Sequence, residues 1–398
     1  MLDRYQRFDL EIRDAQSTHQ VLARSSDGCQ AERALPAERL DALRQRAAQM
    51  PTSAGEEGKE LGRALYAEVL SGSTGELWRR TDTAKADRGE TTREIRICLP
   101  ADSTLHDLPW ELLRDDSGYL ATQPDVVLSR TVPRTGALRQ PAAQGRLRVL
   151  LTSGFAAHEG ARLRAEEVQV RRALSNLADI RTHAQVTAGA LGDLFEAAPH
   201  IWHHIGHGAL ARGGDDREHR VSVQDPHPLR SATGEDLAEQ LGRQHSLQLA
   251  VVSTCHAASR VGLATCLARI EVPLVVGFVG LLSDRAAEIF AKTFYEHLTR
   301  VTVGHAIAAS RRALANDVGL TALEWSQVVY YASAENIRLI HPPGTAAEVP
   351  REVSGDRPHI HFGDPGGAAL WIDQVSAENA AVATHMGNVT FNSTRQHK

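Results

Sequence analysis

The sequence predicts an α/β fold whose core is a mostly parallel sheet flanked by helices, preceded by a smaller N-terminal α+β region. After residue 146, short β-branched runs alternate with longer helical stretches, which is typical of parallel strands joined by crossover helices. The runs LQLAVVS at 247–253 and VPLVVGF at 272–278 are almost continuously apolar, as expected of strands that are covered on both faces.

The N-terminal region, residues 1–140, is predicted to begin with a β-hairpin and continue with helices. Apolar and polar side chains alternate along residues 5–35, and turn formers occupy 25–28, which favours a hairpin. Residues 36–82 follow a helical period around a loop at 51–55. The later elements expected in this region are strands at 93–99 and 126–132, with the segment LPWELL at 108–113 between them.

The core, residues 146–341, is predicted to alternate strands with helices after a boundary loop at 136–145. Strands are expected at 148–152, 183–187, 201–205, 247–253 and 273–278. Helices are expected at 160–178, 188–197, 234–243, 257–269, 284–299 and 303–315. Residues 342–398 are expected to be a linker and tail, forming either a small β appendage or a recruitment segment that orders on contact.

Composition excludes several classes of function. The net charge is -5, and the basic residues are interspersed with acidic ones, which argues against a nucleic-acid surface. The longest apolar run, Leu274–Leu282, is far shorter than the about 18 residues of a membrane span, so no membrane partner is expected. The charged N-terminus does not resemble a secretory signal, and a cytoplasmic location is expected. The four cysteines lie far apart without a CxxC pair, so neither a zinc knuckle nor a disulfide framework is indicated.

The segment HIWHHIGHG at 200–208 carries four histidines and allows two interpretations. If it were helical, His200, His203, His204 and His207 would share one face, as in a metal site. The β-branched isoleucines and the two glycines instead favour a strand followed by a turn. We therefore expect His207 at the carboxyl end of a strand and no metal site or other cofactor.

The segment LQLAVVSTCHAAS at 247–259 predicts a buried strand that ends in a cysteine just before a helix. A thiol beside a helix N-terminus is stabilised as thiolate, and its own backbone N–H can point at an oxyanion. Parallel strands end at the same edge of a sheet, so Cys255 and His207 could form a nucleophile and its acid–base partner. The alternative is that Cys255 is a small buried apolar residue and that the histidine is unremarkable.

The two segments HIWHHIGHG and LAVVSTCHAAS resemble the His and Cys blocks of the CHAT family, caspase-like cysteine peptidases related to separase. Three further segments resemble the same family: LPWELLRDDSGYLATQPDVVLSRTVP at 108–133, VPLVVGFVGLLSDRAAEIFAKTFYEHL at 272–298 and VGHAIAASRRAL at 303–314. The resemblance covers roughly residues 90–335 and implies a caspase-like (caspase-hemoglobinase) core. It makes Cys255 the nucleophile, His207 its acid–base partner, and the backbone N–H groups of Gly208 and Cys255 the oxyanion hole.

The resemblance also implies a pocket for the substrate residue that precedes the cut. Its positions correspond here to Glu159, Ser253 and Asp284, and two acids would favour an arginine or lysine side chain. For Asp284 the alternative is a structural role as the N-cap of the following helix, and for Glu159 the alternative is a solvated side chain without a role in the pocket.

The resemblance implies that the protein is a cytosolic cysteine endopeptidase that cleaves specific protein substrates. It is expected to stay latent until a sensor or regulatory protein activates it. Relatives of this kind serve bacterial defence and programmed cell death. Some caspase relatives dimerise through an edge strand, whereas a single chain is expected here. Two alternatives stay open: a catalytically idle interaction scaffold with the same fold, and a metal-binding enzyme that uses the histidine cluster.

Overall fold

The computed structural model describes residues 5–15, 17–87, 92–133, 146–154, 160–213, 216–221, 232–241, 246–270, 272–333 and 338–339. The chain divides into two units, Met1–Pro343 and Gly344–Lys398, and all of these residues belong to the first. The boundary loop predicted at 136–145 and the tail predicted at 342–398 lie outside the described residues.

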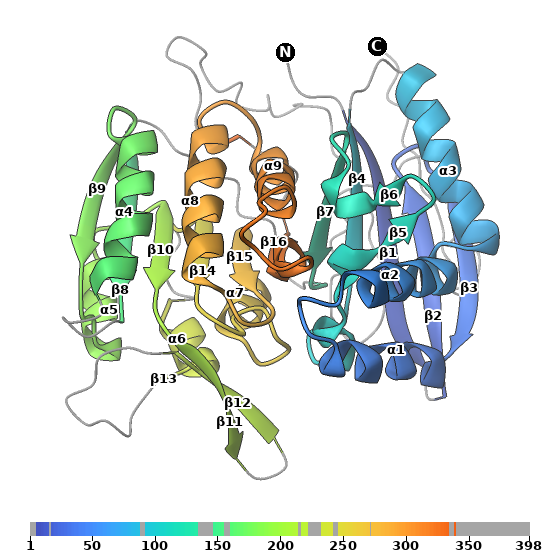
Figure 1. The fold of residues 1–398 in the computed structure, drawn as a ribbon, viewed down its shortest axis with the longest axis horizontal. Helices are drawn as coiled ribbons and strands as arrows, with labels where there is room; N and C mark the ends of the chain where they lie inside the picture. Colours follow the sequence, from blue (N-terminus) through green and yellow to red (C-terminus); the bar gives the residue numbers. More distant parts are fainter. Residues whose placement is uncertain are drawn as a thin grey trace, which may run out of the picture. The chain divides into compact units, whose positions relative to one another are not determined.

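One sheet of eleven strands runs through the described residues (Figure 1). Its N-terminal strands are β1 (Tyr5–Ala15), β2 (Thr18–Ser25), β3 (Gln30–Pro36), β4 (Thr92–Cys98) and β7 (Val126–Thr131). Its C-terminal strands are β8 (Leu147–Ser153), β9 (Ala178–His183), β10 (Ile201–Ile205), β14 (Leu249–Ser253), β15 (Leu274–Phe278) and β16 (Val328–Ala332). The order is β3-β2-β1-β4-β7-β16-β15-β14-β10-β8-β9. Strands β9, β8, β10, β14 and β15 are parallel, which confirms the predicted fold class.

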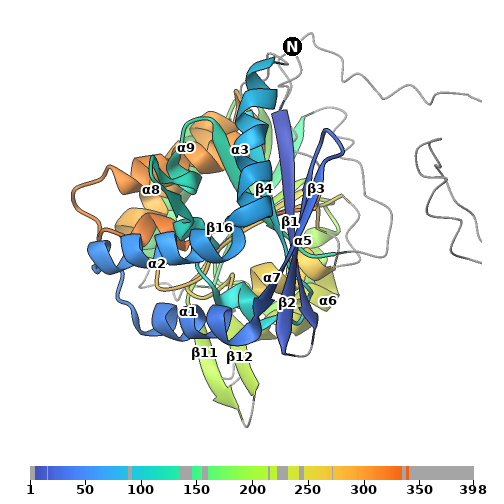
Figure 2. The same ribbon diagram turned by 90° about the vertical axis from the view of Figure 1, so that its right-hand side faces the viewer.

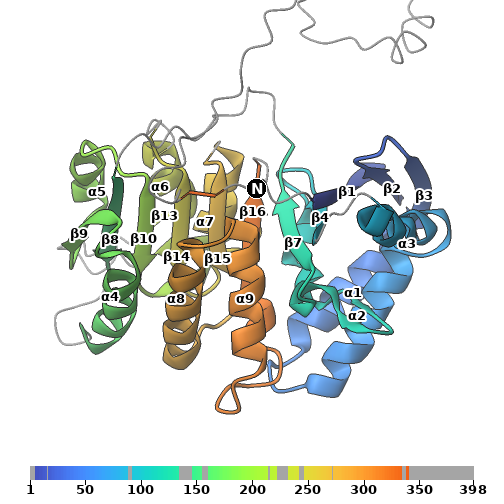
Figure 3. The ribbon, with the colours of Figure 1, turned by 90° about the horizontal axis from the view of Figure 1, so that it is seen from above.

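Helices cover both faces of the C-terminal part of the sheet (Figure 3). One layer consists of α4 (Gly160–Leu174), α8 (Asp284–Leu298) and α9 (Val303–Ala315), and the other of α5 (Ala188–Phe195), α6 (Gly234–Leu241) and α7 (Leu263–Arg269). Alternate strand residues enter two separate apolar cores: Ile201 and Val251 join one, and Trp202 and Val252 join the other. Burial on both faces is the reason that these strands are continuously apolar.

The N-terminal strands are packed against helices on one face, where α1 (Ala37–Gln49), α2 (Gly55–Val69) and α3 (Gly72–Asp87) lie (Figure 2). Phe8, Leu10 and Ile12 of β1 are fully buried, whereas the intervening Asp9 and Glu11 are half-buried and form ion pairs. This alternation is typical of a strand with one covered face. The 3-10 helices η1 (Thr104–Asp107) and η2 (Trp110–Leu112) lie between β4 and β7.

Several predicted elements need correction. Residues 5–36 form three antiparallel strands rather than one hairpin, because the chain also reverses between Ala15 and Thr18. The strand expected at 183–187 lies earlier, at 178–183; it forms the edge of the sheet and therefore lacks the apolar run used to find strands. The sequence reading also missed β16 and a small sheet of β11 (Gly208–Gly213), β12 (Asp216–Val221) and β13 (Ala232–Thr233).

Candidate active site

His207 and Cys255 follow the carboxyl ends of two neighbouring parallel strands, β10 and β14. The register of this pair sets Ile205 opposite Ser253. The Gly206 N–H continues the ladder by donating to the Ser253 carbonyl, at 3.2 Å. His207 and Cys255 each lie two residues beyond the paired positions, and adjacent strands are only about 5 Å apart. The predicted dyad residues therefore share one edge of the sheet.

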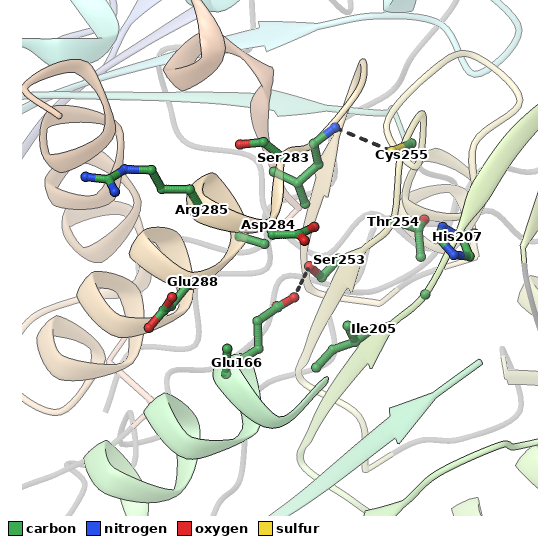
Figure 4. A pocket seen from close by; sticks show the side chains of 14 residues that line it. Glu166, Ile205, His207, Ser253, Thr254, Cys255, Ser283, Asp284, Arg285 and Glu288 are labelled. Carbon is green, nitrogen blue, oxygen red and sulfur yellow. Dashed lines mark hydrogen bonds between the residues drawn. The ribbon is translucent and has the colours of Figure 1, made fainter. Parts of the chain in front are cut away.

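Both residues line one cavity of about 370 Å³ (Figure 4). It opens between the ends of β10 and β14, the start of α8 and one face of α4. Its lining residues are Ala165, Glu166, Ile205, Gly206, His207, Ser253, Thr254, Cys255, Leu282, Ser283, Asp284, Arg285, Ala287 and Glu288. Cys255 is half-buried and His207 is exposed, so both side chains are accessible to a substrate.

The surroundings of Cys255 differ from the sequence expectation. The helix expected at 257–269 begins only at Leu263, because residues 254–262 form turns and bends, so Cys255 does not directly precede a helix. Instead, the backbone N–H of Leu282 donates to Cys255 Sγ at 3.4 Å. Leu282 immediately precedes Ser283, the N-cap of α8, so this bond ties the sulfur to the start of that helix. The next residue, His256, has φ +58°, a left-handed conformation that is costly for a side chain with a Cβ.

The other histidines of the cluster have separate structural partners. His203 and His204 point to opposite faces of β10, since successive strand residues alternate. His203 bonds to Tyr295 and Glu166, whereas His204 bonds to the Thr152 hydroxyl at 2.9 Å. His200 Nδ1 accepts the backbone N–H of Arg148 at 3.2 Å. A helical metal-binding face is therefore wrong for this segment, and the described residues contain no group of three or more His, Cys, Asp or Glu side chains that could hold a metal ion.

Glu166 is a residue of the cavity that the sequence analysis missed. It lies on α4 and is 4% exposed, and its two carboxylate oxygens accept bonds from Ser253 Oγ at 3.2 Å and His203 Nε2 at 3.1 Å. The sequence gives no signal for it, because only the packing of α4 against α8 decides which of the adjacent acids Glu166 and Glu167 faces inward.

The predicted pocket residues are partly brought together. Ser253 and Asp284 both line the cavity, whereas Glu159 lies outside the described residues. Asp284 is not the N-cap of α8: Ser283 holds that position, and its hydroxyl accepts the Ala286 N–H at 3.2 Å. Figure 4 shows the Asp284 carboxylate directed toward Ser253 instead. Gly208, predicted to serve the oxyanion hole, begins β11 directly after His207.

The model of one protein family, the CHAT domain, matches residues 56–332 of the chain. No curated protein matches the sequence. Among solved structures, separase from the separase–securin complex of Saccharomyces cerevisiae is 10% identical with a TM-score of 0.47; the match covers 82% of this chain but 30% of that one. The Arg-specific cysteine proteinase gingipain R is 11% identical with a TM-score of 0.43, covering 76% of this chain and 74% of that one. A chain from the complex of the pro- and mature domains of Porphyromonas gingivalis RgpB is 11% identical with a TM-score of 0.46. The match covers 75% of this chain and 77% of that one.

Proposed function

The chain belongs to the CHAT domain family, and from this premise we propose that it is a caspase-like cysteine endopeptidase with Cys255 as nucleophile and His207 as acid–base partner. The observation that supports this most is the strand register, because it gives both residues access to one cavity. The Cys255 thiolate attacks the substrate carbonyl carbon, and His207 protonates the departing amine. Water, deprotonated by His207, then hydrolyses the thioester and releases the thiol.

Backbone groups would supply the remaining electrostatic stabilisation. The Leu282 N–H donates to Sγ and holds the sulfur at the wall of the cavity. The N–H groups of Gly208 and Cys255 are proposed to stabilise the oxyanion that forms on the carbonyl oxygen. The cavity lined by Ser253 and Asp284 is proposed to receive the side chain of the residue that precedes the cut.

The direct test is mass spectrometry of new peptide termini in a cell-derived peptide library. Wild type should create termini that are missing with Cys255→Ala and His207→Ala, whereas Cys266→Ala should cut as wild type does. Cys266 is the matched control because it is 3% exposed, and burial raises the pKa of its thiol to about 11. Cleavage by Cys255→Ala at the wild-type rate would refute the assignment.

We further propose that the enzyme acts in the cytoplasm on specific protein substrates, is latent until a sensor or regulatory protein engages it, and serves bacterial defence or programmed cell death. These points are supported by the family resemblance. The described residues include no helix with the length and apolarity needed to cross a membrane. If a peptidyl electrophile leaves Cys255 unmodified in the presence of cell extract, the idle scaffold becomes the better description.

A further inference from the structure

Thr254 carries a buried hydroxyl that has no hydrogen-bond partner among the described residues. The residue lines the cavity between Ser253 and Cys255 and is 1% exposed. The other two hydroxyls of the cavity lining do have partners, since Ser253 Oγ donates to Glu166 and Ser283 Oγ accepts a backbone N–H. A buried hydroxyl without a partner is costly and rare in folded proteins, so the one on Thr254 calls for an explanation.

The strand register brings Thr254 next to His207. Ser253 pairs with Ile205, and both strands run in the same direction. The residues that follow this pair, Thr254 and Gly206, therefore also lie side by side, on chains that are about 5 Å apart. His207 is the next residue after Gly206. Figure 4 shows the Thr254 hydroxyl on the side that faces the His207 ring.

The proposed chemistry requires a defined orientation of the His207 ring. One ring nitrogen takes the thiol proton of Cys255 with its lone pair, so the proton of the neutral ring has to be on the other nitrogen. His207 is exposed, and packing restricts its ring less than it restricts the buried rings of His203 and His204. A hydrogen-bond acceptor on the side of the ring opposite Cys255 would select both the orientation and the tautomer.

On the basis of the proposed function, we propose that Thr254 is a positioning residue: its Oγ1 accepts the N–H of the His207 ring nitrogen that faces away from Cys255. The bond forms when the ring takes its reactive orientation, because catalytic hydrogen bonds commonly tighten only in the complex with substrate. The hydroxyl without a partner in the free chain is then a local cost in stability of the kind that functional sites carry. Thr254 acts on the substrate only through His207.

The test follows alkylation of Cys255 by iodoacetamide in the full chain, measured by mass spectrometry of the peptide that contains this residue, so it does not depend on an activator. Thr254→Val replaces the hydroxyl by a methyl group of similar size. At about pH 7 the variant should react about 3- to 10-fold more slowly than wild type. At about pH 10 cysteine thiols ionise without the help of a base, and the two rates should be equal. Thr254→Ser keeps a hydroxyl and should restore the rate at about pH 7.

Thr302→Val is the matched control. Thr302 is also buried, and its hydroxyl also lies beside a histidine, 2.7 Å from His305 Nδ1, but it does not line the cavity. This variant should react like wild type at both pH values. The melting temperature of Thr254→Val should not fall, because valine removes a hydroxyl that has no partner in the free chain. If Thr254→Val does not fold, Thr254→Ala must show the loss at about pH 7 for the inference to stand.

Three outcomes would overturn the inference: a wild-type rate of Thr254→Val at about pH 7, an equal loss at both pH values, or no recovery in Thr254→Ser. An equal loss would mean that the substitution had only displaced Cys255. His207→Ala distinguishes these outcomes from failure of the proposed function. If His207→Ala itself reacts at the wild-type rate at about pH 7, the dyad is wrong. If it reacts slowly and Thr254→Val does not, only the role of Thr254 is refuted.

Discussion

Two cysteines only eleven positions apart occupy opposite chemical environments. Cys255 is half-buried, lines a cavity and accepts a backbone N–H at its sulfur. Cys266 lies on α7 and packs into the apolar core, where burial raises the pKa of its thiol to about 11. A thiol that stays protonated at neutral pH is a poor nucleophile. Cys266 is therefore expected to be unreactive because of its position in the fold and not because of its residue type.

His106 provides a prediction on pH dependence. Burial, followed by the nearby charge of Arg130, lowers its pKa from about 6.5 to about 3. The ring is neutral in the folded state, where Nε2 lies 2.9 Å from the Pro100 carbonyl. Unfolding frees the ring to bind a proton once the pH falls below its ordinary pKa. The folded state should thus lose stability from about pH 6.5 down to about pH 3, by at most about 1.4 kcal/mol per pH unit.

The measurement is urea unfolding at about pH 7 and about pH 5, comparing wild type with His106→Gln. Glutamine keeps an N–H for the Pro100 carbonyl but does not titrate. The variant should show a smaller loss of stability on acidification, although His200 and His256, whose pKa values burial also lowers, still contribute in the same direction. Equal losses in both proteins would show that His106 does not contribute.

The turns that follow Cys255 are held by a segment more than 150 residues earlier in the chain. The Asp107 carboxylate accepts the Arg260 N–H at 2.9 Å, and the Arg269 guanidinium donates to the carbonyls of Ala101 and Arg260. Tyr331 Oη lies 2.9 Å from Thr265 Oγ1, which in turn donates to the Ser259 carbonyl. These contacts fix the segment 256–262, whose first residue has the left-handed conformation described above.

Removing the Asp107 carboxylate should therefore disturb the position of Cys255. Asp107→Ala should lower kcat several-fold with little change in KM, and should slow alkylation of Cys255 by a similar factor. Asp107→Asn keeps an oxygen acceptor and should restore most of both values. Asp102→Ala, an exposed acid of the same segment, is the control. An alkylation rate in Asp107→Ala equal to that of wild type would exclude the positioning role.

The sequence predicted the elements whose pattern is local and missed those set by distant contacts. Strands β10, β14 and β15 were identified because burial on both faces makes them apolar throughout. The edge strand β9 was misplaced because only Ala178 of its six residues is buried, so it lacks a continuous apolar run. The placement of His207 and Cys255 near one another could be predicted because each lies two residues beyond the end of a buried strand. Glu166 could not be predicted as a cavity residue, because its inward direction depends on the packing of α4 against α8. The turns after Cys255 could not be predicted either, because they depend on hydrogen bonds to residues 101–107.

The N-terminal region and the core form one continuous sheet, because β7 pairs with β16. A buried ionic network lies at this junction. Glu111 binds Arg130 through both oxygens, at 3.1 and 2.5 Å, and lies 3.6 Å from Arg311 of α9. Arg311 also donates to the carbonyls of Leu128 in β7 and Val328 in β16. One arginine thus joins both strands of the junction, and β16 lies inside the sheet between β7 and β15.

This network predicts that the N-terminal region and the core unfold together, and that Glu111 stabilises the folded state of both. All three side chains are fully buried. Burial lowers the pKa of Arg311 to about 10, so it stays charged at neutral pH. Glu111→Gln would leave two buried cations without their carboxylate, which should cost about 3–5 kcal/mol of unfolding free energy.

In urea unfolding followed by both circular dichroism and tryptophan fluorescence, wild type and Glu111→Gln should each show one transition, with the variant's midpoint much lower. The surface pair Arg46–Glu60, at 2.8 Å, offers the control. Glu60→Gln should change stability by less than about 1 kcal/mol, because exposed ion pairs contribute little. Two separate transitions in the variant would mean that the core folds without the N-terminal region. In that case the junction between β7 and β16 would be an interface between two independent domains rather than the interior of one.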